Sequence, residues 1–213
     1  LTSQAVIAFQ MRSIGPTGQP LMVDGVVGSV TWWALKTNDQ DRANHDRPFA
    51  PEFDTAFRNA LAARTVAVAM REMAAGAREI GENNRGEFVE KYLRGKTGAW
   101  CAGYASFCVE EASRDTNIPM PFNYTGGARN ILRQLEAQGF AFDEGEPMGG
   151  DLMFWWRSAP DSWKGHVEIV THFAHGTVFS IGGNRGKYPA PVRRFNYSIE
   201  RERQFLSFAR LGT

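Results

Sequence analysis

The sequence predicts an α+β fold for the main part of this 213-residue chain. Stretches with helical periodicity come first, and short apolar runs bounded by Gly, Pro and Asp follow from residue 150 onward. Helices gathered before strands, rather than alternating with them, indicate an α+β architecture. The length is sufficient for one sizeable domain with its own core and a small additional module.

The composition is that of an ordinary globular protein, with 43% apolar residues, 22% charged residues and a formal charge of +1. No basic stripe stands out, so nucleic acid is a poor candidate partner. The longest mostly apolar run, residues 60–73, is interrupted by Arg64 and Arg71 and is too short to span a bilayer, so membrane insertion is not expected. No heptad pattern or large apolar patch appears, and we expect a monomer.

The N-terminal residues are predicted to form a separate helical module over residues 1–36. The segment TSQAVIAFQ has helical periodicity with Thr2 or Ser3 as N-cap, and Ser29 can cap a second short helix. Residues 37–53 are polar with two prolines and are predicted to be a linker. No secretory signal is visible, and because the chain begins with Leu1 we expect an N-terminal piece, with any export signal, to be missing.

Residues 54–213 are predicted to form the main domain. Asp54 is a good N-cap for its first helix, and Thr125 and Gly139 flank its last helix. The predicted helices cover residues 56–76, 87–93, 101–112 and 126–138, and the predicted strands cover residues 151–156, 166–172, 177–183 and 204–211.

Both cysteines lie in the stretch GAWCAGYASFCVEE, which has the character of one helix. Seven residues of helix rise by about 10.5 Å, too far for a disulfide between Cys101 and Cys108. Cys101 lies in the first turn, where free N–H groups and the helix dipole lower the pKa of a thiol. Cys108 lies two turns deeper on an apolar face and is expected to be a small core residue. Position alone leaves Cys101 open between nucleophile and core residue.

A cysteine nucleophile needs a base, usually histidine, and a group that orients the base. His166 opens a predicted strand directly after a glycine, whereas the remaining three histidines fall in the linker, at the far end of the strand and in a turn. If strands 166–172 and 177–183 pair as a hairpin, Asn184 lies beside the start of the first strand and can accept from the imidazole. Glu168 shares a face with His166 and competes for that role.

Four motifs in order, GAWCAGYASFCVEEAS, GGDLMFWW, GHVEIV and FSIGGNRG, resemble the CHAP family of cysteine, histidine-dependent amidohydrolases/peptidases. This family is related to NlpC-type cell-wall hydrolases on a papain-like fold. The upstream segment REIGENNRGEFVEKYL is similar to the one that precedes the cysteine in one branch of the family. The resemblance covers roughly residues 60–190.

The resemblance implies a papain-like catalytic domain in which a Cys-bearing helix packs on an antiparallel sheet that carries the His. By that likeness Cys101 is the nucleophile, His166 the base and Asn184 the polar third residue. Many members carry a Glu two residues before that Asn, where this sequence has Gly182. A catalytic carboxylate is therefore expected only if Glu168 substitutes for it.

The N-terminal module resembles a second family. AVIAFQ followed by VDGVVGSVTWWAL is similar to the latter part of the peptidoglycan-binding domain of cell-wall hydrolases, a three-helix module whose first helix has no counterpart here. The module is therefore expected to be partial. Both resemblances imply the same partner, peptidoglycan, through its glycan strand and stem peptide.

Together these observations predict an endolysin-like peptidoglycan hydrolase that acts on the cell wall. The resemblance leaves open an N-acetylmuramoyl-L-alanine amidase and a stem-peptide or cross-bridge endopeptidase. Trp100, Trp156, Asn84 and Arg85 are the expected substrate contacts. No cofactor or metal is expected, because CxxC and HExxH spacings are missing from the sequence. The alternatives are an inactive wall-binding scaffold, an antibacterial effector with the same chemistry and a hydrolase of another amide.

Overall fold

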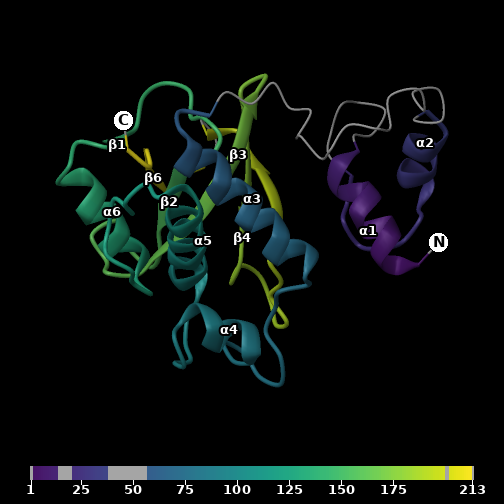
Figure 1. The fold of residues 1–213 in the computed structure, drawn as a ribbon, viewed down its shortest axis with the longest axis horizontal. Helices are drawn as coiled ribbons and strands as arrows, with labels where there is room; N and C mark the ends of the chain where they lie inside the picture. Colours follow the sequence, from purple (N-terminus) through teal and green to yellow (C-terminus); the bar gives the residue numbers. More distant parts are fainter. Residues whose placement is uncertain (1, 14–20, 38–56, 200–201, 213) are drawn as a thin grey trace. The chain divides into compact units, whose positions relative to one another are not determined.

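The computed structural model describes residues 2–13, 21–37, 57–199 and 202–212 (Figure 1). The chain separates into two compact units, residues 1–52 and residues 53–213. The predicted linker over residues 37–53 lies, apart from Thr37, outside the described residues, and so does the predicted cap Asp54.

The first unit holds helices α1 (Ser3–Arg12) and α2 (Ser29–Thr37) around a small core. Thr2 is the N-cap of α1, because its Oγ1 accepts from the Ala5 N–H at 3.4 Å. The buried Gln10 side chain hydrogen-bonds the loop between the helices. Its amide oxygen accepts from two backbone N–H groups of the loop, and its NH2 group donates to Asp24. The core of this unit contains Phe9, Leu21 and Ala34, with Leu35 packed against them.

The second unit begins with a helix that starts later than the sequence suggested. Helix α3 covers Ala60–Ala74, and its N-cap is Asn59, whose Oδ1 accepts from the Ala62 N–H at 2.9 Å. Phe57 forms an isolated bridge with Gly149, which keeps the chain before Asn59 out of the helix. The remaining helices are α4 (Glu87–Tyr92), α5 (Cys101–Thr116) and α6 (Ala128–Glu136).

A six-stranded antiparallel sheet follows, with strand order β1-β6-β2-β3-β4-β5. The four predicted strands are present, and β1 and β5 are additional. The strands are β1 (Ala141–Phe142), β2 (Leu152–Trp156), β3 (Gly165–Ala174), β4 (Thr177–Gly182), β5 (Arg193–Tyr197) and β6 (Phe205–Ala209).

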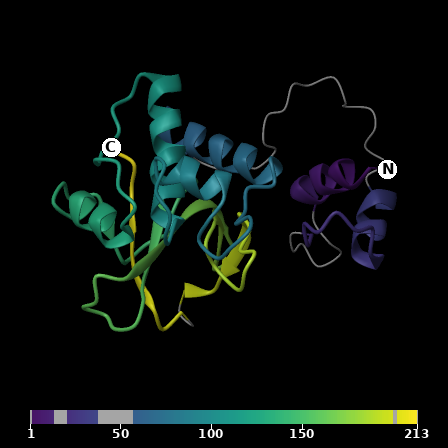
Figure 2. The same cartoon turned by 90° about the horizontal axis from the view of Figure 1, so that it is seen from below.

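The helices α3 and α5 lie against each other on one side of the sheet (Figures 1 and 2). Alternation along β2 and β3 turns one set of side chains to each face. One set contains Leu152, Phe154, Val167 and Ile169, all at most 1% exposed. The opposite set belongs to a second core cluster of Met153, Trp155, Val170, Val178, Tyr197 and Phe208.

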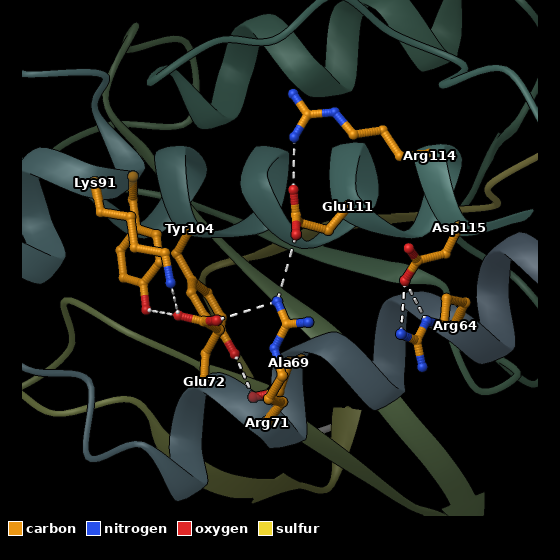
Figure 3. A network of polar contacts seen from close by, with 10 residues as sticks. Arg64, Ala69, Arg71, Glu72, Lys91, Tyr104, Glu111, Arg114 and Asp115 are labelled. Carbon is orange, nitrogen blue, oxygen red and sulfur yellow. Dashed lines mark hydrogen bonds and ion pairs between the residues drawn. The ribbon is translucent and has the colours of Figure 1, made fainter. Parts of the chain in front are cut away.

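A polar network ties α3, α4 and α5 together (Figure 3). The buried Glu72 of α3 accepts from Lys91 Nζ and from the Tyr92 hydroxyl, each at 2.7 Å. Arg71 contacts both Glu72 and Glu111, and Tyr104 donates to the Ala69 carbonyl at 3.0 Å. These contacts fix the direction of α5, whose first residue is Cys101.

The predicted α+β class is confirmed, with the Cys-bearing helix packed on an antiparallel sheet that carries the His. None of the helices in the described part of the chain is long and apolar enough to cross a membrane.

Candidate active site

Cys101 is the first residue of α5, where the sequence placed it. Gly98, in a positive-φ conformation, leads the chain to Trp100, which occupies the N-cap position without a side-chain cap. The first backbone N–H groups of a helix have no intrahelical partner, so the start of α5 offers donors and a positive dipole end beside the sulfur. Cys101 is 5% exposed and Cys108 is fully buried, and both are free thiols.

His166, the second residue of β3, contacts the Cys101 thiol. Burial, the strongest influence on this thiol, opposes its ionisation. The charge and hydrogen bond of His166, together with the backbone N–H groups of Val167 and Ala102, outweigh burial and lower the pKa of Cys101. Burial raises the pKa of Cys108 far above its ordinary value, so that thiol stays protonated. Only one of the two thiols is therefore poised as a nucleophile.

Glu168 contacts the same imidazole from the other side. His166 Nε2 lies 3.0 Å from Glu168 Oε1, which leaves Nδ1 for the thiol. Burial alone would lower the pKa of His166, but the Cys101 thiolate and the Glu168 carboxylate raise it. Burial likewise opposes ionisation of Glu168, but the His166 imidazole, Ser180 and Arg185 lower its pKa. Cys101, His166 and Glu168 therefore form a continuous chain of thiol, imidazole and carboxyl groups, and the direction of each pKa shift favours the charged form of its group.

The carboxylate of Glu168 is held by four side chains. Ser180 Oγ donates to Oε2 at 2.6 Å, and the Tyr197 hydroxyl lies 3.0 and 3.1 Å from the two oxygens. Arg185 donates from one terminal nitrogen to Oε1 at 3.3 Å. With His166 as the fourth partner, both oxygens are fully engaged and the carboxylate has one orientation.

Gly182 makes the room that Glu168 occupies. A Cβ at Gly182 would lie 2.4 Å from Glu168 Cγ, a distance that carbon atoms do not tolerate. A side chain on β4 at this position and Glu168 on β3 therefore exclude each other. The carboxylate beside the imidazole therefore comes from β3, the strand that neighbours β4.

Asn184 does not lie against the imidazole in this structure; its described contacts go elsewhere. Its Oδ1 accepts from the Trp100 N–H at 3.3 Å, and its Nδ2 donates to Glu79 Oε1 at 3.2 Å and to Asn84 Oδ1 at 2.7 Å. The residue lies beyond the end of β4 at φ +59°, in the left-handed region. The expected contact between Asn184 and His166 is therefore replaced by one between Asn184 and the start of α5.

Trp100 is not a groove wall, which corrects the expectation that its ring contacts substrate. The side chain is fully buried and stacks on Tyr92, with ring centroids 5.7 Å apart. Its indole N–H donates to Glu79 Oε1 at 3.2 Å. A Cβ at Gly183 would lie 2.2 Å from the indole ring, so this glycine gives the ring its space.

The other expected substrate contacts lie in three different environments. Asn84 belongs to the buried network, because its N–H donates to Glu79 at 3.0 Å and its side chain accepts from Asn184. Arg85 is exposed and pairs with Glu82. Trp156 is half-buried at the end of β2. Arg85 is the most exposed of the three, whereas Asn84 and Trp156 are both half-buried.

Four residues around the site were not singled out from the sequence. The alternation of side chains along β4 places Ser180 on the face of Glu168, so the predicted hairpin could have identified it. Arg185 follows Asn184 directly. Tyr197 lies on β5, a strand that the sequence did not reveal. Glu79 accepts from Asn84, Trp100, Asn184 and the Ala190 N–H, partners that only the tertiary fold assembles.

No metal-binding group of three or more His, Cys, Asp or Glu residues occurs among the residues that the structure describes. His172 stacks on Phe179 with centroids 4.2 Å apart, and burial together with Arg194 lowers the pKa of His172 to about 4. Of the histidines that the structure describes, His166 is the one that contacts a thiol.

Residues 93–184 match the family model of the CHAP domain. No curated protein matches the chain. Among solved structures, the chain is similar to the crystal structure of Ly7917, at 16% identity and a TM-score of 0.45, over 70% of this chain and 62% of that one. It is also similar to the structure of Ly7917 with the hydrolyzing product of MDP, at 18% identity and a TM-score of 0.43, over 69% of this chain and 63% of that one. The chain thus spans less than two thirds of these solved structures.

Proposed function

We propose that this chain, whose residues 93–184 form a CHAP domain, is a peptidoglycan hydrolase that cleaves an amide bond with Cys101 as nucleophile. The observation that carries the proposal is the contact of the Cys101 thiol with His166, whose other ring nitrogen lies 3.0 Å from Glu168. A thiol, an imidazole and a buried carboxylate in this order are the parts of a cysteine amidase or peptidase.

The reaction has two halves. The Cys101 thiolate attacks the amide carbonyl, and the tetrahedral intermediate collapses to a thioester when the imidazolium of His166 gives its proton to the leaving amine. Neutral His166 then takes a proton from water, the hydroxide attacks the thioester, and the thiolate leaves to restore the ion pair. Glu168 keeps the imidazole oriented through both halves and stabilises its protonated form.

The oxyanion of each tetrahedral intermediate needs donors beside the nucleophile. The backbone N–H of Cys101, at the start of α5, is the donor we propose. Asn184 accepts from the N–H of the preceding residue, Trp100, and so holds the backbone that carries this donor. Asn184 therefore supports the nucleophile's backbone, while Glu168 supports the base.

The substrate class follows from the family, and we infer that the enzyme acts on the cell wall. The scissile bond is the N-acetylmuramoyl-L-alanine amide or a bond of the stem peptide or cross-bridge. Arg85 and Trp156 are the proposed contacts to the polymer. Residues 1–36 are a proposed wall-binding element, supported by the exposed apolar side chains Met22, Val26 and Val30. Co-sedimentation of the Cys101→Ala protein with sacculi, with and without Met22→Glu and Val26→Glu, tests that element.

Digestion of purified sacculi tests the function, with mass spectrometry of the released muropeptides to identify the cut bond. The intact chain should clear sacculi, Cys101→Ala should abolish clearing, and Cys108→Ala should retain most of it. Cys108 is a matched control because it is the second buried thiol of the same helix.

Two outcomes contradict the proposal in different ways. Fast alkylation of Cys101 by iodoacetamide without release of any muropeptide would indicate a hydrolase of another amide. Slow, equal alkylation of Cys101 and Cys108 would indicate a scaffold without catalytic activity.

A further inference from the structure

Arg185 lies in a cage of three aromatic rings beside the proposed catalytic residues. Its guanidinium carbon is 5.2 Å from the ring centroid of Trp155, 5.4 Å from that of Phe195 and 5.0 Å from that of Tyr197. The rings come from β2 and β5, and the arginine lies three residues beyond the end of β4. Arginine over aromatic faces is held by cation–π attraction, so the cage fixes the guanidinium although its side chain is 30% exposed.

The guanidinium and the imidazole share one carboxylate oxygen. Arg185 donates to Glu168 Oε1 at 3.3 Å, and His166 Nε2 lies 3.0 Å from the same atom. The same terminal nitrogen of Arg185 also donates to the Tyr197 hydroxyl at 2.5 Å, and that hydroxyl lies within hydrogen-bonding distance of both oxygens of Glu168. The arginine is therefore coupled to the base through the carboxylate, directly and through a tyrosine.

The groups that act on His166 come from helix α5 and from four strands of the sheet. Cys101 contacts it from α5 and Glu168 from its own strand, and the ring of Trp155 on β2 lies 5.6 Å away. Ser180 on β4 and Tyr197 on β5 act on it through Glu168. The pKa of Tyr197 is raised by burial and by Glu168, so its hydroxyl stays neutral. When Cys101 and His166 form an ion pair, the charged set is thiolate, imidazolium, carboxylate and guanidinium, and these four charges cancel.

We propose that Arg185 is a positioning residue that offsets the charge of Glu168 and so sets the pH range in which Cys101 and His166 form the reactive ion pair. This inference rests on the proposed cysteine chemistry. Without the guanidinium, the Glu168 charge is less compensated and holds the imidazolium proton more tightly. Removing the guanidinium also makes the net charge of the connected groups more negative, so thiol ionisation requires a higher pH. The pH at which the thiol ionises and the pH at which the imidazolium loses its proton are the two limits of the reactive range, and both therefore move upward.

The test is the pH dependence of Cys101 alkylation by iodoacetamide, in a Cys108→Ala background so that one thiol reports. Arg185→Met removes the charge but keeps a long apolar side chain among the rings, and Arg185→Lys keeps the charge as the matched control. We expect the methionine variant to shift both limbs of the profile upward by about one pH unit. The lysine variant should shift them by less than half as much.

A profile with unmoved limbs and only a lower plateau or lower Tm would overturn the inference, because loss of packing alone lowers the reactive fraction without moving its pH limits. Arg185→Gln is a second neutral variant in case the methionine variant does not fold. Alkylation needs no wall substrate, so the two proposals fail separately. Unmoved limbs count against the role of Arg185, whereas intact limbs without muropeptide release count against the wall substrate.

Discussion

Glu168 and Glu79 are both buried carboxylates near the start of α5, with exposed fractions of 1% each, but their partners differ in kind. Glu168 contacts an imidazole, two hydroxyls and a guanidinium. Every described partner of Glu79 is an N–H group: two backbone amides, an indole and a side-chain amide. An imidazole gains and loses protons near neutral pH, and these N–H groups do not.

The comparison shows that closeness to a nucleophile does not define a catalytic acid. In the proposed mechanism, Glu168 acts on the sulfur through the imidazole of His166, a group that titrates. Glu79 connects the loop at Asn84, the indole of Trp100 and the turn at Asn184, so its charge holds segments in place. Substitutions that separate activity from stability should distinguish the two residues.

Glu168→Gln should have the largest effect. The amide lacks the charge that stabilises the imidazolium, and its NH2 group replaces one of the two acceptors, so we expect kcat/KM on sacculus fragments to fall about 100-fold or more. The measurement is turnover per folded molecule, with folding checked by circular dichroism. Activity within a few fold of the unmodified chain would show that the carboxylate does not act on the base.

Glu79→Gln should mainly affect stability. The carboxamide NH2 faces N–H donors where an oxygen was, so at least one buried donor loses its acceptor, at a cost of about 1–3 kcal/mol in the free energy of unfolding. Urea denaturation measures this change. The rate of Cys101 alkylation per folded molecule should stay within about threefold of the unmodified chain, and a loss as large as that of Glu168→Gln would erase the contrast.

The neighbouring glycines 182 and 183 offer a matched pair of smaller changes. A Cβ at Gly182 meets Glu168 and a Cβ at Gly183 meets Trp100, at 2.4 and 2.2 Å respectively. Each alanine variant should lose about 1–3 kcal/mol of stability through overpacking. Only Gly182→Ala should in addition lower kcat in the folded fraction, because it displaces the carboxylate. Equal kinetic losses in both variants would contradict this assignment.

Asp151 is another buried carboxylate and should show the smallest effect. Burial raises its pKa to about 6, against the N–H of Met148, which favours the charged form. The folded state therefore binds the proton more tightly than the unfolded state, and the free energy of unfolding should fall as pH rises from about 4 to about 6. Asp151→Asn should remove this slope and be more stable at pH 7 by about 1–2 kcal/mol. The exposed Asp143→Asn is the control, and an unchanged slope in Asp151→Asn would contradict the assignment.

Most helices and strands could be predicted from the sequence, because short segments carry the apolar and turn-residue patterns that define them. Short apolar runs bounded by Gly, Pro and Asp identified β2, β3, β4 and β6, and the helix that begins at Cys101 followed from its position and composition. The sequence did not predict strand β5, because RRFNY is mostly polar. The strand lies at the edge of the sheet, and its side chains do not alternate between buried and exposed positions. Helix α3 was started too early because Asp54 and Asn59 are equally good caps in sequence, and only the Phe57 bridge separates them.

The site was partly readable for the same reason. The period of two along β3 placed Glu168 on the face of His166. The position of Asn184 depends on its left-handed backbone conformation. The position of Trp100 depends on the space above Gly183, which lies some 80 residues further along the chain. The sequence offered a plausible position for each residue but not the partner that each one meets.

The missing side chain at Gly182 has a consequence for how relatives of this chain would be judged. A sequence alignment that requires a carboxylate at the position of Gly182 would class this protein as inactive. In this chain the space beside Gly182 is instead occupied by Glu168 from the adjacent strand, and that carboxylate contacts the imidazole. Whether a functional carboxylate is absent is therefore better judged from the three-dimensional structure than from a sequence alignment.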